Sequence, residues 1–191
     1  LAPSGREILM VERDGPLGTS DPDELFHNWK RNGVAHLRQS HAFLARLRKI
    51  MKDEHPALLD QLLANGVREL PFDVWLTEQQ QANYEAAPED ADLTIITSRR
   101  TTLEMTMRRY VETLPNVKLL CRFRVERLIT HKKDGGVLHV SGIEGVQDGK
   151  AVTLTADIIV DTSGKGGRSI NQLIAEGANI AAESETAGIL Y

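Results

Sequence analysis

Cysteine is almost absent from this chain. Its 191 residues contain a single one, Cys121, so no disulfide can form within the chain. No apolar run approaches the roughly 20 residues of a membrane-spanning helix, and the N-terminus has no signal-peptide pattern. A chain without disulfides suits a reducing compartment. We therefore expect a cytoplasmic protein with no membrane span.

The two common glycine motifs for nucleotide phosphates are missing as well. Neither G-x-G-x-x-G nor G-x-x-x-x-G-K-[ST] occurs in the sequence. Positive charge is not in excess either, because the formal net charge is −4, which gives no reason to expect nucleic acid or an anionic membrane as a partner. What is present is ordinary for a globular protein, with 41% hydrophobic and 26% charged residues.

Residues 156–169 form the stretch around which the rest of the chain is organised. The apolar run at residues 158–160 does not alternate with polar residues, which is typical of a strand buried on both faces of a parallel sheet. Asp161 ends the run, and the small residues that follow, Gly164 among them, would let a phosphate or a flavin approach the backbone closely. A glycine-rich turn without a ligand accounts for the same residues equally well.

A second short apolar run, residues 8–11, ends at Glu12. In a Rossmann-type sheet, an acid at the end of a strand accepts hydrogen bonds from the hydroxyls of a ribose. A solvated glutamate at a strand end is the simpler alternative. The glycine fingerprint that accompanies such an acid lies about 20 residues upstream of it, and only 11 residues precede Glu12.

The middle of the chain predicts helices first. Apolar residues recur at helical spacing over residues 43–51 and again over residues 58–63. Pro56 suits the first turn of the second helix, and Gly66 suits a left-handed residue just beyond its end. Residues 69–93 follow as an excursion toward the substrate side of the protein.

A strand over residues 93–97 is expected next, followed by a helix that Thr101 and Glu104 would open as a capping box. Residues 123–155 then predict three strands separated by turn residues, which form an antiparallel β-meander ahead of the run at residues 158–160. A short helix that ends near Gly177 closes the order.

Four motifs occur in one order along the chain. They are Val11-Glu12-Arg13, Gly-Val-Ala-His-Leu-Arg at residues 33–38, Ser-Arg-Arg-Thr-Thr-Leu-Glu at residues 98–104, and Asp-Thr-Ser-Gly-Lys-Gly-Gly-Arg at residues 161–168. Together they resemble the middle of an FAD-dependent oxidoreductase of the flavin monooxygenase superfamily, which includes aromatic hydroxylases and epoxidases. The resemblance implies an α/β fold, with an FAD/NAD(P)-binding Rossmann-like parallel sheet and an inserted antiparallel β-meander.

The resemblance covers nearly the whole chain. It implies that residues 1–191 are a single partial FAD-binding domain, truncated at both ends. The first strand with its glycine turn would precede Leu1, and a Gly-Asp motif would follow Tyr191. We therefore expect an internal fragment that is inactive by itself.

The resemblance also implies which residues bind the cofactor. Glu12 would hold the adenosine ribose of FAD, and Arg13 would flank the adenine. Arg38 would lie over the phosphates or the ribityl chain, where a planar guanidinium suits phosphate oxygens, although a solvated loop arginine is the plainer alternative. Arg100 would face the same phosphate and ribityl region, whereas Arg99 beside it is equally well explained as a surface charge.

Three more residues take roles by the same resemblance. Val125 would touch adenine through its backbone groups, or would simply be a core residue of its strand. Asp161 and Gly164 would lie near the pyrophosphate, at a motif that also serves the nicotinamide cofactor. The histidines, including His131 and His139, have no spacing that suits a metal ion, so we expect them to be structural or exposed.

No catalytic side chain is implied, because the chemistry of such enzymes belongs to the cofactor. NAD(P)H would reduce FAD, and the reduced flavin would use oxygen to hydroxylate or epoxidise a small organic substrate. A flavin-dependent halogenase or an isoprenoid-type reductase of the same fold is the first alternative. A methyltransferase is another, although the meander argues against it, and a non-catalytic α/β nucleotide-binding module is the third. The substrate, the choice between NADH and NADPH and the oligomeric state stay open.

Overall fold

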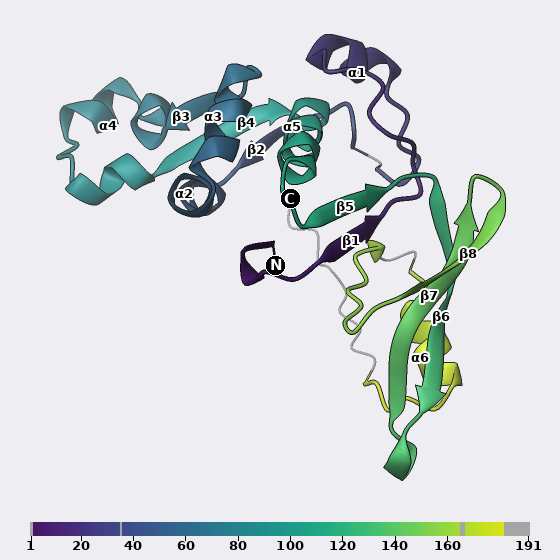
Figure 1. Cartoon of the computed structure of the whole chain (residues 1–191). Coiled ribbons are helices and arrows are strands. Elements are labelled where there is room, and N and C mark those ends of the chain that lie inside the picture. The colour runs from purple at the N-terminus through teal and green to yellow at the C-terminus, as the bar shows by residue number, and fades with distance from the viewer. Residues whose placement is uncertain (1, 35, 165–166, 182–191) are drawn as a thin grey trace. The chain divides into compact units, whose positions relative to one another are not determined.

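The computed structural model describes residues 2–34, 36–164 and 167–181 (Figure 1). Contacts divide the chain into two compact units. The first unit contains Leu1–Met10 and Asp14–Leu119, and the second contains Val11–Arg13 and Leu120–Tyr191. The expectation of one domain over residues 1–191 stays a prediction. None of the helices in the described part is long and apolar enough to cross a membrane.

The first unit contains a three-stranded antiparallel sheet with the order β2-β4-β3. The strands are β2 (Ser40–Phe43), β4 (Thr94–Arg99) and β3 (Arg68–Pro71). The central strand β4 confirms the strand expected around residues 93–97. Between β3 and β4 lie only short helices, and these are η2 (Phe72–Trp75), α4 (Glu78–Ala82) and η3 (Pro88–Asp92). The substrate-side role of residues 69–93 stays a prediction.

Both predicted helices in the middle of the chain are present, as α2 (Ala45–Glu54) and α3 (Pro56–Ala64). Pro56 occupies the first turn of α3, and Gly66 has a φ of 88° just beyond its end, the left-handed conformation that only glycine adopts without strain. Apolar side chains from both helices, the turn after α3, β4 and the helix after β4 form one buried cluster: Met51, Leu58, Leu59, Leu62, Val67, Ile96 and Leu103.

A second buried cluster joins α1 (Pro22–Asn28) to α5 (Arg100–Glu112). Its members are Leu25, Trp29, Leu37 and Met105. Asp21 caps α1 by accepting hydrogen bonds from two backbone N–H groups of its first turn.

The predicted capping box at the start of α5 is wrong. The N-cap of this helix is Arg99, which makes no side-chain capping bond, so Thr101 already lies inside the first turn. The carboxylate of Glu104 accepts hydrogen bonds from two arginine side chains instead of a backbone N–H. A full guanidinium charge attracts a carboxylate more strongly than a neutral amide does.

β1 (Ile8–Val11) and β5 (Val117–Leu120) form a two-stranded sheet. The N–H of Ile8 donates to the carbonyl of Asn116 at 2.8 Å, and the N–H of Glu12 donates to that of Leu120 at 2.8 Å. Because the two bonds keep the same offset along both strands, the strands are parallel. Leu9 and Met10 on β1 are exposed, so this predicted strand is present without the buried faces typical of a central parallel strand.

The second unit contains the predicted meander. β6 (Phe123–Lys132), β7 (Leu138–Gln147) and β8 (Lys150–Thr155) pair antiparallel in this order. The 3-10 turn η4 (Asp134–Gly136) joins the first two strands. The final helix, α6 (Ser169–Ala175), packs on β6 and confirms the short helix expected there. The chain therefore has a mixed α/β fold with a parallel sheet and an antiparallel meander.

The buried strand predicted at residues 158–160 is wrong. These residues belong to no strand, and Ile158 and Val160 are exposed by 64% and 62%. A strand of a parallel sheet needs hydrogen-bonded neighbours. Within the described residues no strand pairs with this run, so an apolar sequence alone does not make it a strand.

Candidate functional site

The seven residues predicted to bind FAD are divided between the two units. Arg38 and Arg100 lie in the first unit. The second unit contains Glu12, Arg13, Val125, Asp161 and Gly164. Their roles stay predictions, and the local surroundings of each can be described within its own unit.

Arg38 and Arg100 are brought to the same end of a pair of strands. Arg38 lies two residues before β2, and Arg100 directly follows β4, the antiparallel partner of β2. The N–H of Arg100 donates to the carbonyl of Gln39 at 3.1 Å. Strand pairing thus brings the backbone of Arg100 to Gln39, the residue that follows Arg38.

The guanidinium of Arg38 binds the C-terminal end of α1. Its Nε donates to the carbonyl of Phe26 at 2.9 Å, and its Nη2 donates to those of His27 at 3.0 Å and Trp29 at 3.2 Å. A cation at this position satisfies free carbonyls and complements the helix dipole. A phosphate at Arg38 would have to compete with these carbonyls.

The side chain of Arg100 belongs to a network of alternating charges. Its Nε donates to Oε1 of Glu104 at 2.5 Å, while Oε2 of Glu104 accepts from Nη1 of Arg31 at 2.5 Å. Arg31 also donates through Nε to Asp14 at 3.1 Å, and its guanidinium lies 5.3 Å from the ring centroid of Trp29. The side chain of Glu104 is only 12% exposed, so its charge depends on these two arginines.

Within the second unit, the backbone of Glu12 bonds to residues on both sides of the start of β6. Its N–H donates to Leu120, and its carbonyl accepts from the N–H of Phe123 at 3.0 Å. The Glu12 side chain is half-buried, whereas Arg13 is exposed. Val125 is 43% exposed on β6, beside a register shift in the pairing with β7, so it is not the core residue that an apolar strand position suggests.

Asp161 and Gly164 form a tight turn. Oδ1 of Asp161 accepts from the hydroxyl of Ser163 at 2.6 Å and from its N–H at 2.8 Å. These bonds, with a further one from the Ser169 side chain, hold the pKa of Asp161 below its ordinary value of 3.8. Gly164 has a φ of 72°, which favours glycine. In the same motif, Lys165 and Gly166 lie outside the described residues, as does Ala35 in the motif that contains Arg38.

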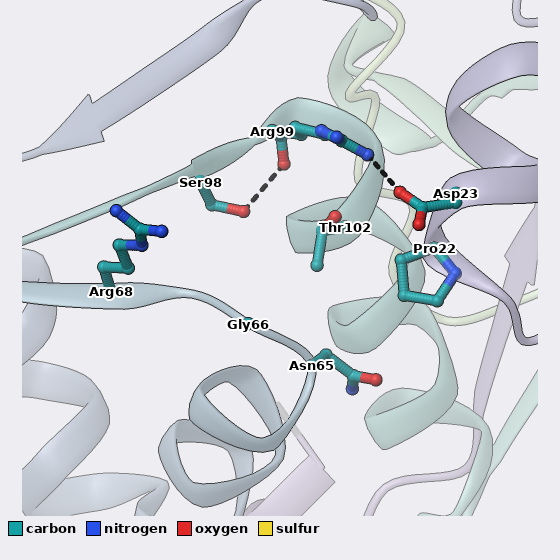
Figure 2. Close-up of a pocket in the computed structure, with 8 residues that line it drawn as sticks. All are labelled: Pro22, Asp23, Asn65, Gly66, Arg68, Ser98, Arg99 and Thr102. Carbon is teal, nitrogen blue, oxygen red and sulfur yellow. Dashed lines mark hydrogen bonds and ion pairs between the residues drawn. The ribbon is translucent and has the colours of Figure 1, made fainter.

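A pocket of about 360 Å³ opens in the first unit, beside the junction of β4 and α5 (Figure 2). We call it the arginine pocket. Its polar lining side chains come from α1, the turn after α3, β3, β4 and α5, and they are Asp23, Asn65, Arg68, Ser98, Arg99 and Thr102. Arg99 donates through Nη1 to Asp23 at 2.5 Å, and its guanidinium lies 4.5 Å from the ring centroid of Phe26.

Sequence reasoning missed two of the charged side chains at these places, Arg31 and Arg68, which belong to no motif. Arg99 is exposed, as its interpretation as a surface charge requires, and it also lines the pocket. The consecutive Arg99 and Arg100 have different partners, Asp23 and Glu104. The doubled arginine at a strand end was the only available signal, because Arg31 and Arg68 reach their places through tertiary packing.

The first unit offers features that suit the diphosphate of FAD. Among the described residues Arg100 is bonded through Nε, which leaves the two terminal nitrogens of its guanidinium as donors. The N-terminus of α5 carries no side-chain cap, so its first-turn N–H groups and its dipole favour an anion. The residues present thus fit the phosphate part of such a cofactor. No group of three potential metal ligands occurs among the described residues.

Comparison with known proteins supports the fold. A variant of PqsL from Pseudomonas aeruginosa superposes with a TM-score of 0.56 at 12% identity, over 97% of this chain and 43% of that one. THI4 from Thermovibrio ammonificans superposes with a TM-score of 0.53 at 13% identity, over 94% of this chain and 56% of that one. A further PqsL structure, described as a probable FAD-dependent monooxygenase, has a TM-score of 0.45 at 11% identity, over 80% of this chain and 35% of that one.

These likenesses concern the fold, because all the identities are low. The chain spans about half the length of the structures it matches, or less. No family model matches the sequence. No curated protein matches it either.

Proposed function

We propose that this chain is part of an FAD-dependent oxidoreductase, an NAD(P)H-using monooxygenase that hydroxylates or epoxidises a small organic substrate. The observation that carries the proposal is the likeness of the fold to PqsL over 97% of the chain. The order of the four sequence motifs supports it independently, because together they resemble those of the same kind of protein. FAD would supply the redox chemistry when bound.

The residues of this chain would bind and orient the cofactor. Arg100 would donate from its terminal nitrogens to phosphate oxygens, with Glu104 fixing the plane of its guanidinium through Nε. Glu12 would accept hydrogen bonds from the adenosine ribose, Arg13 would flank the adenine and Val125 would contact the adenine through its backbone.

The turn at Asp161 and Gly164 would approach the pyrophosphate through its backbone. Arg38 would serve the phosphate or ribityl region, if the anion displaces the carbonyls of α1 from its guanidinium. This part of the proposal predicts that α1 shifts when the cofactor binds.

The first test is spectroscopic and uses the full-length gene product that carries these 191 residues. We expect the purified protein to show the near-ultraviolet and blue absorbance bands of a flavin, and the released cofactor to be FAD by mass. Arg100→Lys should lower the FAD affinity roughly tenfold, because lysine keeps the charge but loses the planar fork. Arg46→Lys, at an exposed position on α2, is the matched control and should leave the FAD affinity unchanged. A protein without flavin that also fails to bind added FAD contradicts the proposal.

The second test separates the reaction classes. Under anaerobic conditions NADPH or NADH should bleach the blue flavin band, and readmitted oxygen should restore it. A protein that binds FAD but is not reduced by either nucleotide would favour a flavoprotein of this fold that takes its electrons elsewhere, such as a halogenase. A protein that binds nucleotide without any redox change would favour the non-catalytic module.

A further inference from the structure

We propose that the arginine pocket binds the oxyanion group of a small molecule, a phosphate monoester or a carboxylate, at a place distinct from the residues predicted to bind FAD. Neither Arg38 nor Arg100 lines this pocket. The inference therefore does not depend on the proposed function.

The first reason is an uncompensated charge. Arg68, on β3, makes no hydrogen bond or ion pair with any described residue, although its strand neighbours are regularly paired with β4. Figure 2 shows its side chain rising from β3 at the edge of the pocket, on the side where Ser98 lies. A guanidinium in this position presents a planar set of donors that matches the oxygens of a phosphate or a carboxylate.

The second reason is a guanidinium held in position on the other side of the pocket. Arg99 packs over the ring of Phe26 and pairs with Asp23. The side chains of that ion pair are exposed by 48% and 77%, so the pair contributes little free energy. A ligand oxyanion can therefore take the place of Asp23 at modest cost, while the aromatic contact keeps Arg99 oriented.

The third reason is the remainder of the lining. Thr102, in the first turn of α5, adds a hydroxyl to the lining. Ser98 and Asn65 add a hydroxyl and an amide. A pocket of about 360 Å³ lies within the range of roughly 300–1,000 Å³ found for small-molecule sites. With so few apolar groups in its lining, the pocket suits a small polar anion better than an aromatic molecule.

The test is isothermal titration calorimetry on the full-length gene product, with inorganic phosphate and with acetate as probes. The two probes distinguish a phosphate group from a carboxylate. We expect one of them to bind with a dissociation constant of about 1 mM or lower, more weakly at higher salt. Two substitutions in the pocket should then change the dissociation constant in opposite directions, a result that a loss of folding cannot produce.

Arg68→Gln should raise the dissociation constant roughly five- to tenfold, because it removes the free cation. Asp23→Asn should lower it about two- to fivefold, because the competitor for Arg99 loses its charge. Arg46→Gln, an exposed arginine on α2 that does not line the pocket, is the matched control. The proposal is overturned if neither probe binds, if Arg46→Gln weakens binding as much as Arg68→Gln, or if Asp23→Asn fails to tighten it.

Discussion

Glu104 accepts a hydrogen bond from Nε of Arg100 at 2.5 Å, one helical turn away on α5. The same carboxylate accepts a hydrogen bond from Nη1 of Arg31, so one acid whose side chain is only 12% exposed balances two guanidinium groups. This arrangement fixes the plane of Arg100 before any ligand arrives. The carboxylate of Glu104 therefore affects both the stability of the first unit and the orientation of Arg100 in the proposed cofactor site.

Glu104→Gln should therefore destabilise the first unit by about 2–3 kcal/mol, because both arginines lose a charged partner whose side chain is only 12% exposed. Urea unfolding followed by tryptophan fluorescence measures this change, since both tryptophans, Trp29 and Trp75, lie in the first unit. Glu112→Gln on the same helix is the control, and because the Glu112 side chain is 42% exposed, its pair with Arg108 should be worth no more than about 0.5 kcal/mol. Equal effects of the two substitutions would contradict a special role for Glu104.

Gln172 on α6 completes the hydrogen bonding of an edge strand. Its Oε1 accepts from the N–H of Leu128 at 2.8 Å, and its Nε2 donates to the carbonyl of Leu128 at 2.9 Å. Gln172→Ala should cost about 1–2 kcal/mol and should expose the amide of Leu128 to faster hydrogen exchange. Asn171→Ala, the exposed neighbour on the same helix, should leave that exchange rate unchanged. Unaltered protection in Gln172→Ala would show that α6 does not hold the edge of β6.

Local chemistry explains why much of this fold could be predicted. The hairpins of the meander follow from turn residues such as Asp148-Gly149, and α3 follows from Pro56 at its start and Gly66 beyond its end. Each of these signals acts over a few residues, so neighbouring sequence is enough to identify it.

The predictions that were wrong, or could not be made, concern features that depend on residues far apart in the sequence. Residues 158–160 have the composition of a buried strand, but burial depends on neighbouring strands that composition does not supply. The capping box failed because α5 begins before Thr101, and the carboxylate of Glu104 accepts from Arg100 and from Arg31, which lies 73 residues away in the sequence. Arg68 could not be predicted to line a pocket, because only the pairing of β3 with β4 brings it beside Ser98 and Arg99.

His131 and His139 face each other across β6 and β7, with ring centroids 4.8 Å apart. Burial, the charge of Lys133 and the neighbouring His131 lower the pKa of His139 from its ordinary value of 6.5. The unfolded chain therefore binds a proton more readily than the folded one. The stabilising contribution of neutral His139 is complete above pH 6.5 and is lost as the pH falls from 6.5 through the lower folded pKa.

An NMR titration of the His139 ring should find its midpoint below 6.5. Lys133→Gln should raise that midpoint, because it removes a like charge. His139→Gln should flatten the fall in thermal stability of the meander between neutral and mildly acidic pH. A midpoint at or above 6.5 would mean that the His139 ring is solvated in the folded protein.

Glu12 provides the last test, because it directly follows β1, at the strand end where a ribose-binding acid is expected. If its carboxylate holds the ribose of FAD, Glu12→Ala removes a charged hydrogen-bonding partner at a cost of about 1–3 kcal/mol. The dissociation constant for FAD in the full-length gene product should then rise roughly tenfold or more. The dissociation constant of Glu12→Asp should lie between those of wild type and Glu12→Ala, because aspartate keeps the charge on a shorter side chain. Glu7→Ala, an exposed acid just before the same strand, controls for the change in net charge. FAD affinity that is identical in wild type, Glu12→Ala and Glu7→Ala would mean that Glu12 is a solvated strand end, even in a protein that binds FAD through Arg100.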